Sequence, residues 1–486
     1  MFCVASVATG AALFWLSDNP FLLSFRTGAA LIVLGLCGCA TVALIVIMRS
    51  RHLVLKGLGA IILSIAVGLA IAGLILLHRN RLLWPSKLSI QDWETDAKYL
   101  TDLIPRAHPN AFANLSPRVF RDQAAEAQAQ IPSRSEAEVE MSLVRLVASI
   151  QDGHSTLFPF QPAAGFRMLP LQIYLFSDGW YITDSSPKYR NVVGKHLLRL
   201  GAKRIEEAFA IVHPFVGADN ESTVQDRAPL YLLCPEVLQA LGIVSGANVV
   251  RLTIADESGN LSEVDVRPTS LIRYLYWYFE PLQQWKRKPP QSASPLYRQY
   301  TWDNYWFRYL EEGRTVYVAF NQVRDKSDES FERFGDRVLQ YCKARGAERL
   351  IIDIRNNDGG DNTIFGDFIQ KLRNHPMNAR GKLYVIIGRH TFSAAVNFTS
   401  AMESETNAIF VGEPAGAGPN HYGDPKKYVL PFSRLWVFIA SRYHQWGQPQ
   451  DRRRAHEPSI TVPVSHVDYF ANRDPVLAAI LSQPTK

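Results

Sequence analysis

The pattern of apolar and polar positions separates an uncharged N-terminal region from a mixed remainder. Residues 27–48 and 57–77 contain no charged side chain. A membrane-spanning helix needs about 20 apolar residues, so both segments are predicted to cross a membrane. The apolar residues 2–16 form a possible third, shorter span. Residues 1–82 are therefore expected to be a transmembrane region.

Basic residues beside the spans indicate the side of the membrane on which the rest of the chain lies. Arg49, Arg51 and Lys56 lie between the two strong spans. Because Lys and Arg are enriched in cytoplasmic loops, the remainder is expected on the periplasmic or extracellular side of a plasma or inner membrane. Arg79 and Arg81 favour the opposite orientation.

Two regions of different periodicity follow the spans. Residues 88–160 have apolar side chains at helical spacing, with a first helix over 92–104 that ends at Pro105. Residues 165–270 contain short runs of strand-forming residues separated by turns, which favours a β-rich module. The polar, proline-rich part of residues 271–300 is typical of a linker.

From about residue 314 the pattern alternates between buried strands and helices. Such alternation is typical of an α/β fold in which helices cover a largely parallel sheet. Residues 301–486 are therefore expected to form one domain. Strands are expected over 314–320, 349–355, 383–388 and 408–412, and helices over 327–344, 361–372 and 391–402.

Composition and charge exclude several functional classes. The chain has 486 residues, a net charge of +7 and five cysteines. Its densest basic run, Arg452–Arg454, is too short to predict a nucleic-acid partner. No group of Cys and His has the spacing of zinc ligands, so no zinc site is expected. No pattern in the sequence sets an oligomeric state.

Three local patterns could carry chemistry. Gly359 and Gly360 follow a buried strand, where exposed backbone N–H groups could stabilise an oxyanion; a plain tight turn is the alternative. Ser393 lies at the start of a helix, where the N–H of Ala394 could complete the same oxyanion hole; a simple helix cap is the alternative. His154 follows a turn and could be the base that a serine needs; an ordinary surface histidine is the alternative.

Six segments occur in a distinctive order along the chain. They are DGHSTL at 152–157, LIIDIRNNDGG at 350–360, TFSAA at 391–395, FVGEPAGAGPN at 410–420, EPSITV at 457–462 and NRDPVLAAIL at 472–481. Their order and wording resemble those of the S41 family of serine peptidases, which includes C-terminal processing and tricorn-like peptidases. The resemblance covers roughly residues 90–480.

The resemblance implies a crotonase/ClpP-like α/β core, with residues 165–270 as a diverged, PDZ-like substrate-binding module. It implies a serine peptidase that hydrolyses peptide bonds through an acyl-enzyme, without a cofactor; the predicted spans would anchor this peptidase in a membrane. The partner would be a peptide or protein substrate. The residues implied are Ser393 as nucleophile, His154 as its base, and Gly359 or Gly360 with Ala394 as the oxyanion hole.

The acidic partner of the histidine departs from the family pattern. No lysine occurs between Ser393 and Lys426, which favours the form of the family that pairs Ser and His with an acid over the Ser–Lys form. The acid is expected shortly before the EPSITV segment, where Asp451 is preferred and Glu457 is the alternative. The unusual Ser459 in that segment leaves a catalytically inactive peptide-binding receptor open. An esterase or amidase acting on non-peptide envelope substrates also stays open, because one oxyanion hole serves any acyl group.

Overall fold

The computed structural model describes residues 60–61, 63–69, 71, 87–161, 164–275 and 294–484. The predicted spans 2–16 and 27–48 lie outside the described residues, as does most of the predicted linker 271–300. The described residues of the span 57–77 are helical. Within the described ranges, no helix combines the length and the apolar composition that a membrane crossing requires.

A helical layer leads up to the turn that carries His154. It consists of α4 (Ile90–Ala107), α5 (Pro117–Gln130) and α6 (Glu136–Ala148). Helix α4 continues two residues beyond Pro105, where its end was expected. Pro105 lacks the N–H that would bond the carbonyl of Thr101, yet the helix continues, and the N–H of His108 donates to Ile104 O (3.1 Å) at its end. Helix α6 ends four residues before the Asp152-Gly153 turn.

The β-rich region holds an antiparallel sheet and three helices. The sheet has the order β2-β3-β4-β6-β7, with β5 beside β4. Its strands are β2 (Leu171–Phe176), β3 (Gly179–Ser185), β4 (His196–Leu200), β5 (Lys203–Arg204), β6 (Val250–Ala255) and β7 (Leu261–Val266). The helices α7 (Ile205–Val212), α8 (Glu221–Leu232) and α9 (Pro235–Ala240) lie between β5 and β6. A short pair, β1 (Arg167–Met168) and β8 (Thr269–Ser270), closes the region.

The C-terminal part is built on a six-stranded sheet of order β18-β13-β12-β11-β10-β9. Every neighbouring pair is parallel except β9 and β10, so the expectation of a largely parallel sheet is confirmed. The strands are β9 (Tyr305–Leu310), β10 (Thr315–Phe320), β11 (Arg349–Asp353), β12 (Leu383–Ile387), β13 (Ile409–Gly412) and β18 (Ile460–Thr461).

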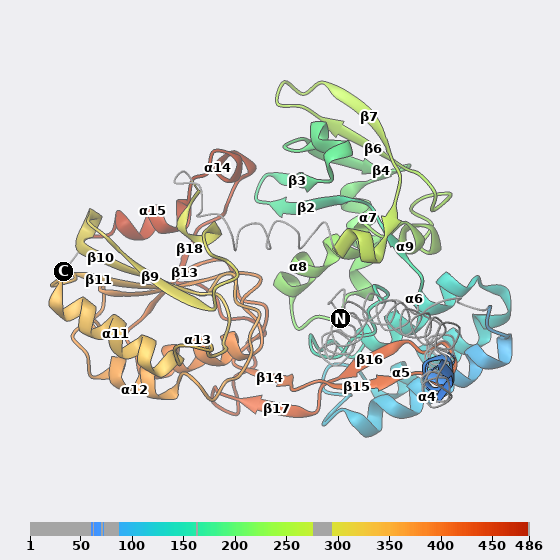
Figure 1. Cartoon of the computed structure of the whole chain (residues 1–486), viewed down its shortest axis with the longest axis horizontal. Helices are drawn as coiled ribbons and strands as arrows, with labels where there is room; N and C mark the ends of the chain where they lie inside the picture. The colour runs from blue at the N-terminus through green and yellow to red at the C-terminus, as the bar shows by residue number, and fades with distance from the viewer. Residues whose placement is uncertain are drawn as a thin grey trace, which may run out of the picture.

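Helices cover both faces of this sheet (Figure 1). On one face lie α11 (Phe331–Ala344), α12 (Gly366–Arg373) and α13 (Ala394–Glu405), packed on Val316 and Val318 of β10. On the other lies α15 (Pro475–Leu481), packed on Tyr317; the short α14 (His466–Phe470) precedes it. Successive side chains of a strand point to opposite faces, which explains this division.

A hairpin arm reaches from the C-terminal part to the helical layer (Figure 1). It is formed by β14 (Asn420–Gly423) with β17 (Arg442–Gln445), and β15 (Lys426–Val429) with β16 (Trp436–Ile439). Leu430, Leu435 and Val437 of this arm are buried in one core with α4, α6 and the β-rich sheet. The carboxylate of Asp96 in α4 accepts the N–H of Phe432 (2.9 Å). The arm therefore ties the predicted catalytic domain to the two regions before it.

Candidate active site

A buried network holds the turn that carries His154. Oδ1 of Asp152 accepts the backbone N–H of His154 (2.9 Å), and Oδ2 accepts the hydroxyl of Ser155. Nε2 of His108 lies 3.1 Å from the same Oδ2. Nδ1 of His108 accepts the N–H of Asn110 (3.0 Å), so Nε2 carries the proton and donates it to the carboxylate.

These bonds keep Asp152 charged in spite of its burial. Its side chain is 2% exposed, and burial alone would raise its pKa. The hydrogen bonds from His108, from the hydroxyl of Ser155 and from the backbone N–H of His154 outweigh burial, so the pKa lies below its ordinary value. A negative charge therefore stands next to the histidine at neutral pH.

The ring of His154 is neutral and unpaired. It stacks on Phe392 (centroids 4.4 Å apart, planes at 22°) and on His421 (5.8 Å, 12°). Burial lowers its pKa to about 3, although the charge of Asp152 opposes this shift. Neither ring nitrogen makes a hydrogen bond to any described residue. A neutral imidazole with a free nitrogen can accept a proton, which is what a general base requires.

Ser393 occupies a strained backbone position. Its φ is 54° and its ψ is −126°, a region that non-glycine residues rarely adopt. Such strain concentrates at functional sites. Ser393 is the N-cap residue of α13, yet its side chain makes no capping hydrogen bond. The nearby Thr391 is bonded to Gly388 N–H and Ile354 O (both 3.0 Å). The hydroxyl of Ser393 thus makes no hydrogen bond within the described part of the chain, and the helix-cap alternative does not account for it.

The glycine loop lies directly against Ser393. Gly359 has φ +113°, and a Cβ built on it would lie 2.7 Å from Cβ of Ser393 and 2.9 Å from N of Ala394. The N–H of Gly359 donates to Oδ1 of Asn357 (3.0 Å). The N–H groups of Gly360 and Ala394 donate to no acceptor in the described chain. Of the two candidate glycines, Gly360 is therefore the one with a free donor.

Ser393 and His154 line one cavity of about 440 Å³, together with Phe392. No hydrogen bond joins the serine hydroxyl to the imidazole in this structure. Such contacts are often long in ligand-free enzymes and tighten on substrate binding.

A charged pair forms another wall of this cavity. Nδ1 of His390 lies 3.0 Å from Oδ2 of Asp226, whose charge raises the pKa of His390 to about 9. The neighbouring Arg227 lies 4.7 Å from the ring centroid of Phe392. The wall therefore carries two cationic side chains at neutral pH.

The predicted acidic partner, Asp451, does not meet the histidine. Its carboxylate pairs with Arg453 (2.7 Å), which also binds Glu403 (2.8 Å). The alternative, Glu457, is exposed to solvent. The structure makes no ion pair between His154 and either residue. The preference for Asp451 is thus corrected, because its carboxylate forms an ion pair with Arg453 rather than with the imidazole of His154.

The carboxyl groups that do approach His154 are those of Asp152 and Asp219. One oxygen of each and one ring nitrogen lie within 4.8 Å of one another. Asp219 lies in the loop before α8 and was not singled out in the sequence, because nothing local distinguishes it from an ordinary loop aspartate. Such ligands could also hold a divalent cation, but Asp152 already accepts three hydrogen bonds.

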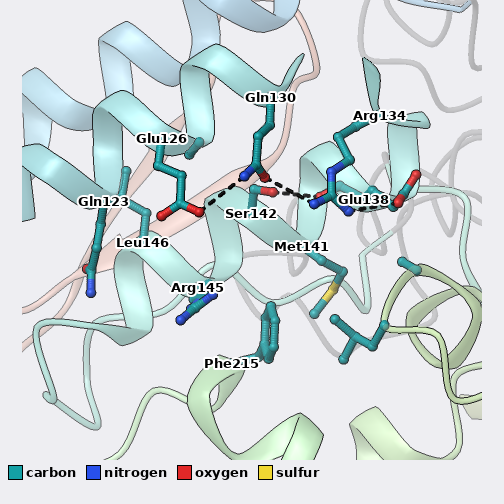
Figure 2. Close-up of a pocket in the computed structure, with 13 residues that line it drawn as sticks. Gln123, Glu126, Gln130, Arg134, Glu138, Met141, Ser142, Arg145, Leu146 and Phe215 are labelled. Carbon is teal, nitrogen blue, oxygen red and sulfur yellow. Dashed lines mark hydrogen bonds and ion pairs between the residues drawn. The ribbon is translucent and has the colours of Figure 1, made fainter. Parts of the chain in front are cut away.

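A separate hollow between α5 and α6 lacks these properties. Figure 2 shows its polar side chains bonded to one another: Gln130 to Glu126 (3.1 Å), and Arg134 to Glu138 (2.9 Å) and Gln130. Phe215 lies at its edge. Because these groups satisfy each other, the hollow presents no comparable reactive arrangement.

Comparison with known proteins identifies the fold. No family model and no curated protein matches the sequence. Among solved structures, mature CPAF complexed with lactacystin superposes with a TM-score of 0.55 at 13% identity, over 81% of this chain and 99% of that one. Mature CPAF alone gives 0.54 at 13% identity, over 82% and 99%. The chain shares its fold with mature CPAF. At this identity the likeness is one of fold, and it confirms the mixed α/β architecture expected from the sequence.

Proposed function

We propose that this protein is a membrane-anchored serine peptidase with Ser393 as nucleophile and His154 as general base. The observation that carries the proposal is the pairing of a strained serine that has a free hydroxyl with a buried, neutral histidine in one cavity. The CPAF-like fold supports peptides over other acyl substrates.

The proposed reaction is acyl transfer. His154 takes the proton of Ser393 as Oγ attacks the carbonyl carbon, and the N–H groups of Gly360 and Ala394 stabilise the resulting oxyanion. His154 then gives the proton to the leaving amine. Water, deprotonated by the same histidine, hydrolyses the acyl-enzyme.

The cavity wall suits a peptide. Phe158, Leu230 and Phe438 offer apolar surface, while His390 and Arg227 offer hydrogen-bond donors. Peptides present both kinds of group, apolar side chains and backbone carbonyls. The inactive-receptor alternative draws support from the unpaired state of His154, and the following experiment separates the two.

The test is digestion of a complex peptide mixture by the detergent-solubilised full chain, with new termini identified by mass spectrometry. We expect cleavage by the wild type and by Ser404→Ala, and none by Ser393→Ala. Ser404 is an exposed residue of the same helix, so it controls for the chemical change itself. Peptides that bind without cleavage would favour the receptor, and cleavage by Ser393→Ala would refute the assignment of the nucleophile.

The anchoring part of the proposal rests on residues 27–48 and 57–77. Within the second segment Ile61, Ile65 and Leu69 expose 58%, 57% and 54% of their surface. Large apolar side chains with this much exposed surface favour a lipid environment. We expect the protein to stay with membranes during alkaline extraction; release into the supernatant would contradict anchoring.

The proposed orientation places the catalytic part on the periplasmic or extracellular side. Ser258 lies in an exposed turn of the β-rich region, and Cys234 and Cys342 are buried. A Ser258→Cys variant in intact cells should therefore react with a membrane-impermeant maleimide more than the unmodified chain does. If the variant and the unmodified chain were labelled equally in intact cells, and the variant were labelled more only after lysis, the catalytic part would lie in the cytoplasm.

A further inference from the structure

Asp219 is brought to the catalytic histidine from a loop far away in the sequence. Its Oδ2 accepts the N–H of Gly153 (3.1 Å), the residue directly before His154. A Cβ on Gly153 would collide with this carboxylate and would lie 2.9 Å from Cζ of Phe392. The turn therefore approaches Asp219 as closely as it does only because residue 153 is glycine.

The loop that carries Asp219 is fixed from two sides. Arg227 donates to the carbonyl oxygens of Gly153 and Gly217 (both 2.7 Å), which joins the histidine turn to this loop. Asn220 caps α8 through Thr223 N–H (3.0 Å) and donates to Ala415 O (2.9 Å). Asp219 itself is 9% exposed. Its carboxyl group is thus held in place beside the imidazole.

We propose that Asp152 and Asp219 form a buried carboxyl pair that takes the acidic role beside His154, with Asp219 as a positioning residue that tunes the strength of the base. This inference rests on the proposed function, since it assigns the partner of the same base. In this proposal the carboxyl pair replaces Asp451, which is ion-paired with Arg453, as the acidic partner of His154.

Two buried carboxyl groups this close do not both ionise readily. Burial and the charge of Asp152 raise the pKa of Asp219 to about 8, against the opposing influence of Arg227 and Arg454. The hydrogen bonds to Asp152 keep that group charged. At neutral pH the pair therefore holds one proton, on Asp219, and one negative charge, on Asp152. The charged or titratable side chains that act on Asp219 are Asp152, Arg227 and Arg454, and His154 lies in the same cluster.

The pair affects catalysis without itself accepting a proton. The proton that leaves Oγ of Ser393 goes to His154 and later to the leaving amine. The charge of Asp152 stabilises the imidazolium in between. When Asp219 also ionises, a second negative charge makes His154 a stronger base, so the rate should rise as the pH passes about 8.

The test measures how fast a fluorophosphonate inactivates the full-length protein between pH 6 and pH 10. Asparagine mimics the protonated form of Asp219 and cannot ionise, so the ratio of the Asp219→Asn rates above and below pH 8 should stay near one, without the rise seen in wild type. Asp152→Asn should lose roughly 10²-fold to 10⁴-fold of the rate, as Asp-to-Asn changes do in serine triads. Asp451→Asn should keep both the rate and the rise.

A rise that persists in Asp219→Asn, or a wild-type rate in Asp152→Asn, would overturn the proposal. A wild type that does not react at all would instead refute the proposed function. The proton on Asp219 is then tested by stability. A carboxyl whose folded pKa is about 8 rather than 3.8 loses stabilisation as the pH rises through that window. Wild type should therefore lose more thermal stability between pH 5 and pH 8 than Asp219→Asn; equal losses would overturn the carboxyl pair independently of catalysis.

Discussion

Adding a single methyl group at Gly153 should disable the site while leaving the fold largely intact. Cβ of an alanine there would overlap the carboxylate of Asp219 and would lie 2.9 and 3.0 Å from Cζ and Cε2 of Phe392. Phe392 cannot retreat freely, because both Arg227 and the imidazole of His154 lie against its ring. The overlap must therefore displace the parts of the site that hold the base.

The magnitude follows from this geometry. Overpacking one methyl group into a buried site costs about 1–3 kcal/mol. Gly153 does not have a left-handed backbone, so no further conformational strain is expected. A gain of about 0.4–1 kcal/mol from the stiffer unfolded chain offsets part of the cost. We expect a net loss of about 1–2 kcal/mol of unfolding free energy. A shift of the base by about 1 Å should lower the rate of acylation about 10²-fold.

The assay combines urea unfolding with the rate of fluorophosphonate inactivation. Gly366→Ala is the matched control, because its added Cβ meets no atom within 4 Å at the exposed start of α12. It should be neutral or slightly stabilising and should react at the wild-type rate. A Gly153→Ala variant that reacts as fast as wild type would refute the reasoning that the Gly153 turn positions the base.

Three further predictions concern strain, the glycine loop and pH. Ser393→Gly should be more stable than Ser393→Ala by about 1–2 kcal/mol in urea unfolding, because only glycine adopts φ 54° and ψ −126° without strain; equal stabilities would argue against a strained serine. Asn357→Ala should lower the free energy of unfolding by about 2–4 kcal/mol in urea, because Asn357 is fully buried, donates to Phe320 O (2.8 Å) and accepts the N–H of Gly359. A loss below about 1 kcal/mol would contradict this reasoning. Burial lowers the pKa of His154 to about 3 and that of His421 to about 4, so the unfolded chain takes up protons first as the pH falls below 6.5. The free energy of unfolding should therefore fall from pH 6.5 towards pH 3, by up to about 1.4 kcal/mol per pH unit for each histidine. In thermal melts, His421→Gln should reduce the dependence of stability on pH in this range. An unchanged dependence would contradict the burial of a neutral His421.

The parallel core could be predicted from the sequence because its strands are buried on both faces. Residues 316–320 and 383–387 are continuous apolar runs, and they lie in strands β10 and β12. The helices begin later than predicted, at Phe331, Gly366 and Ala394 rather than 327, 361 and 391. The residues between strand and helix form the loops that carry the glycines and Ser393. Polar positions in such loops do not reveal where the first helical turn begins.

Long-range contacts account for what the sequence did not predict. Helices α8 and α9 were missed because Pro229 lies inside one and Pro235 at the start of the other, and proline is normally a sign of a helix break. Asp219 and His154 are joined by tertiary packing, which no local pattern records. Asp451 has the expected place in the chain order, yet the nearby Arg453 takes its charge. The family resemblance indicated the segments of Ser393 and His154, which line one cavity, but the side chains that surround them follow from this chain's own packing.

The most direct test of the account is to identify the residue that a fluorophosphonate modifies. The full-length protein in detergent is treated with the probe, digested and mapped by mass spectrometry, with Ser393→Ala and His154→Ala treated in parallel. The account predicts one adduct in the wild type, on Ser393, and no adduct in either variant. Folded wild type without an adduct on Ser393, or His154→Ala labelled at the wild-type rate, would contradict the claim that an imidazole-activated serine is the centre of this protein's activity.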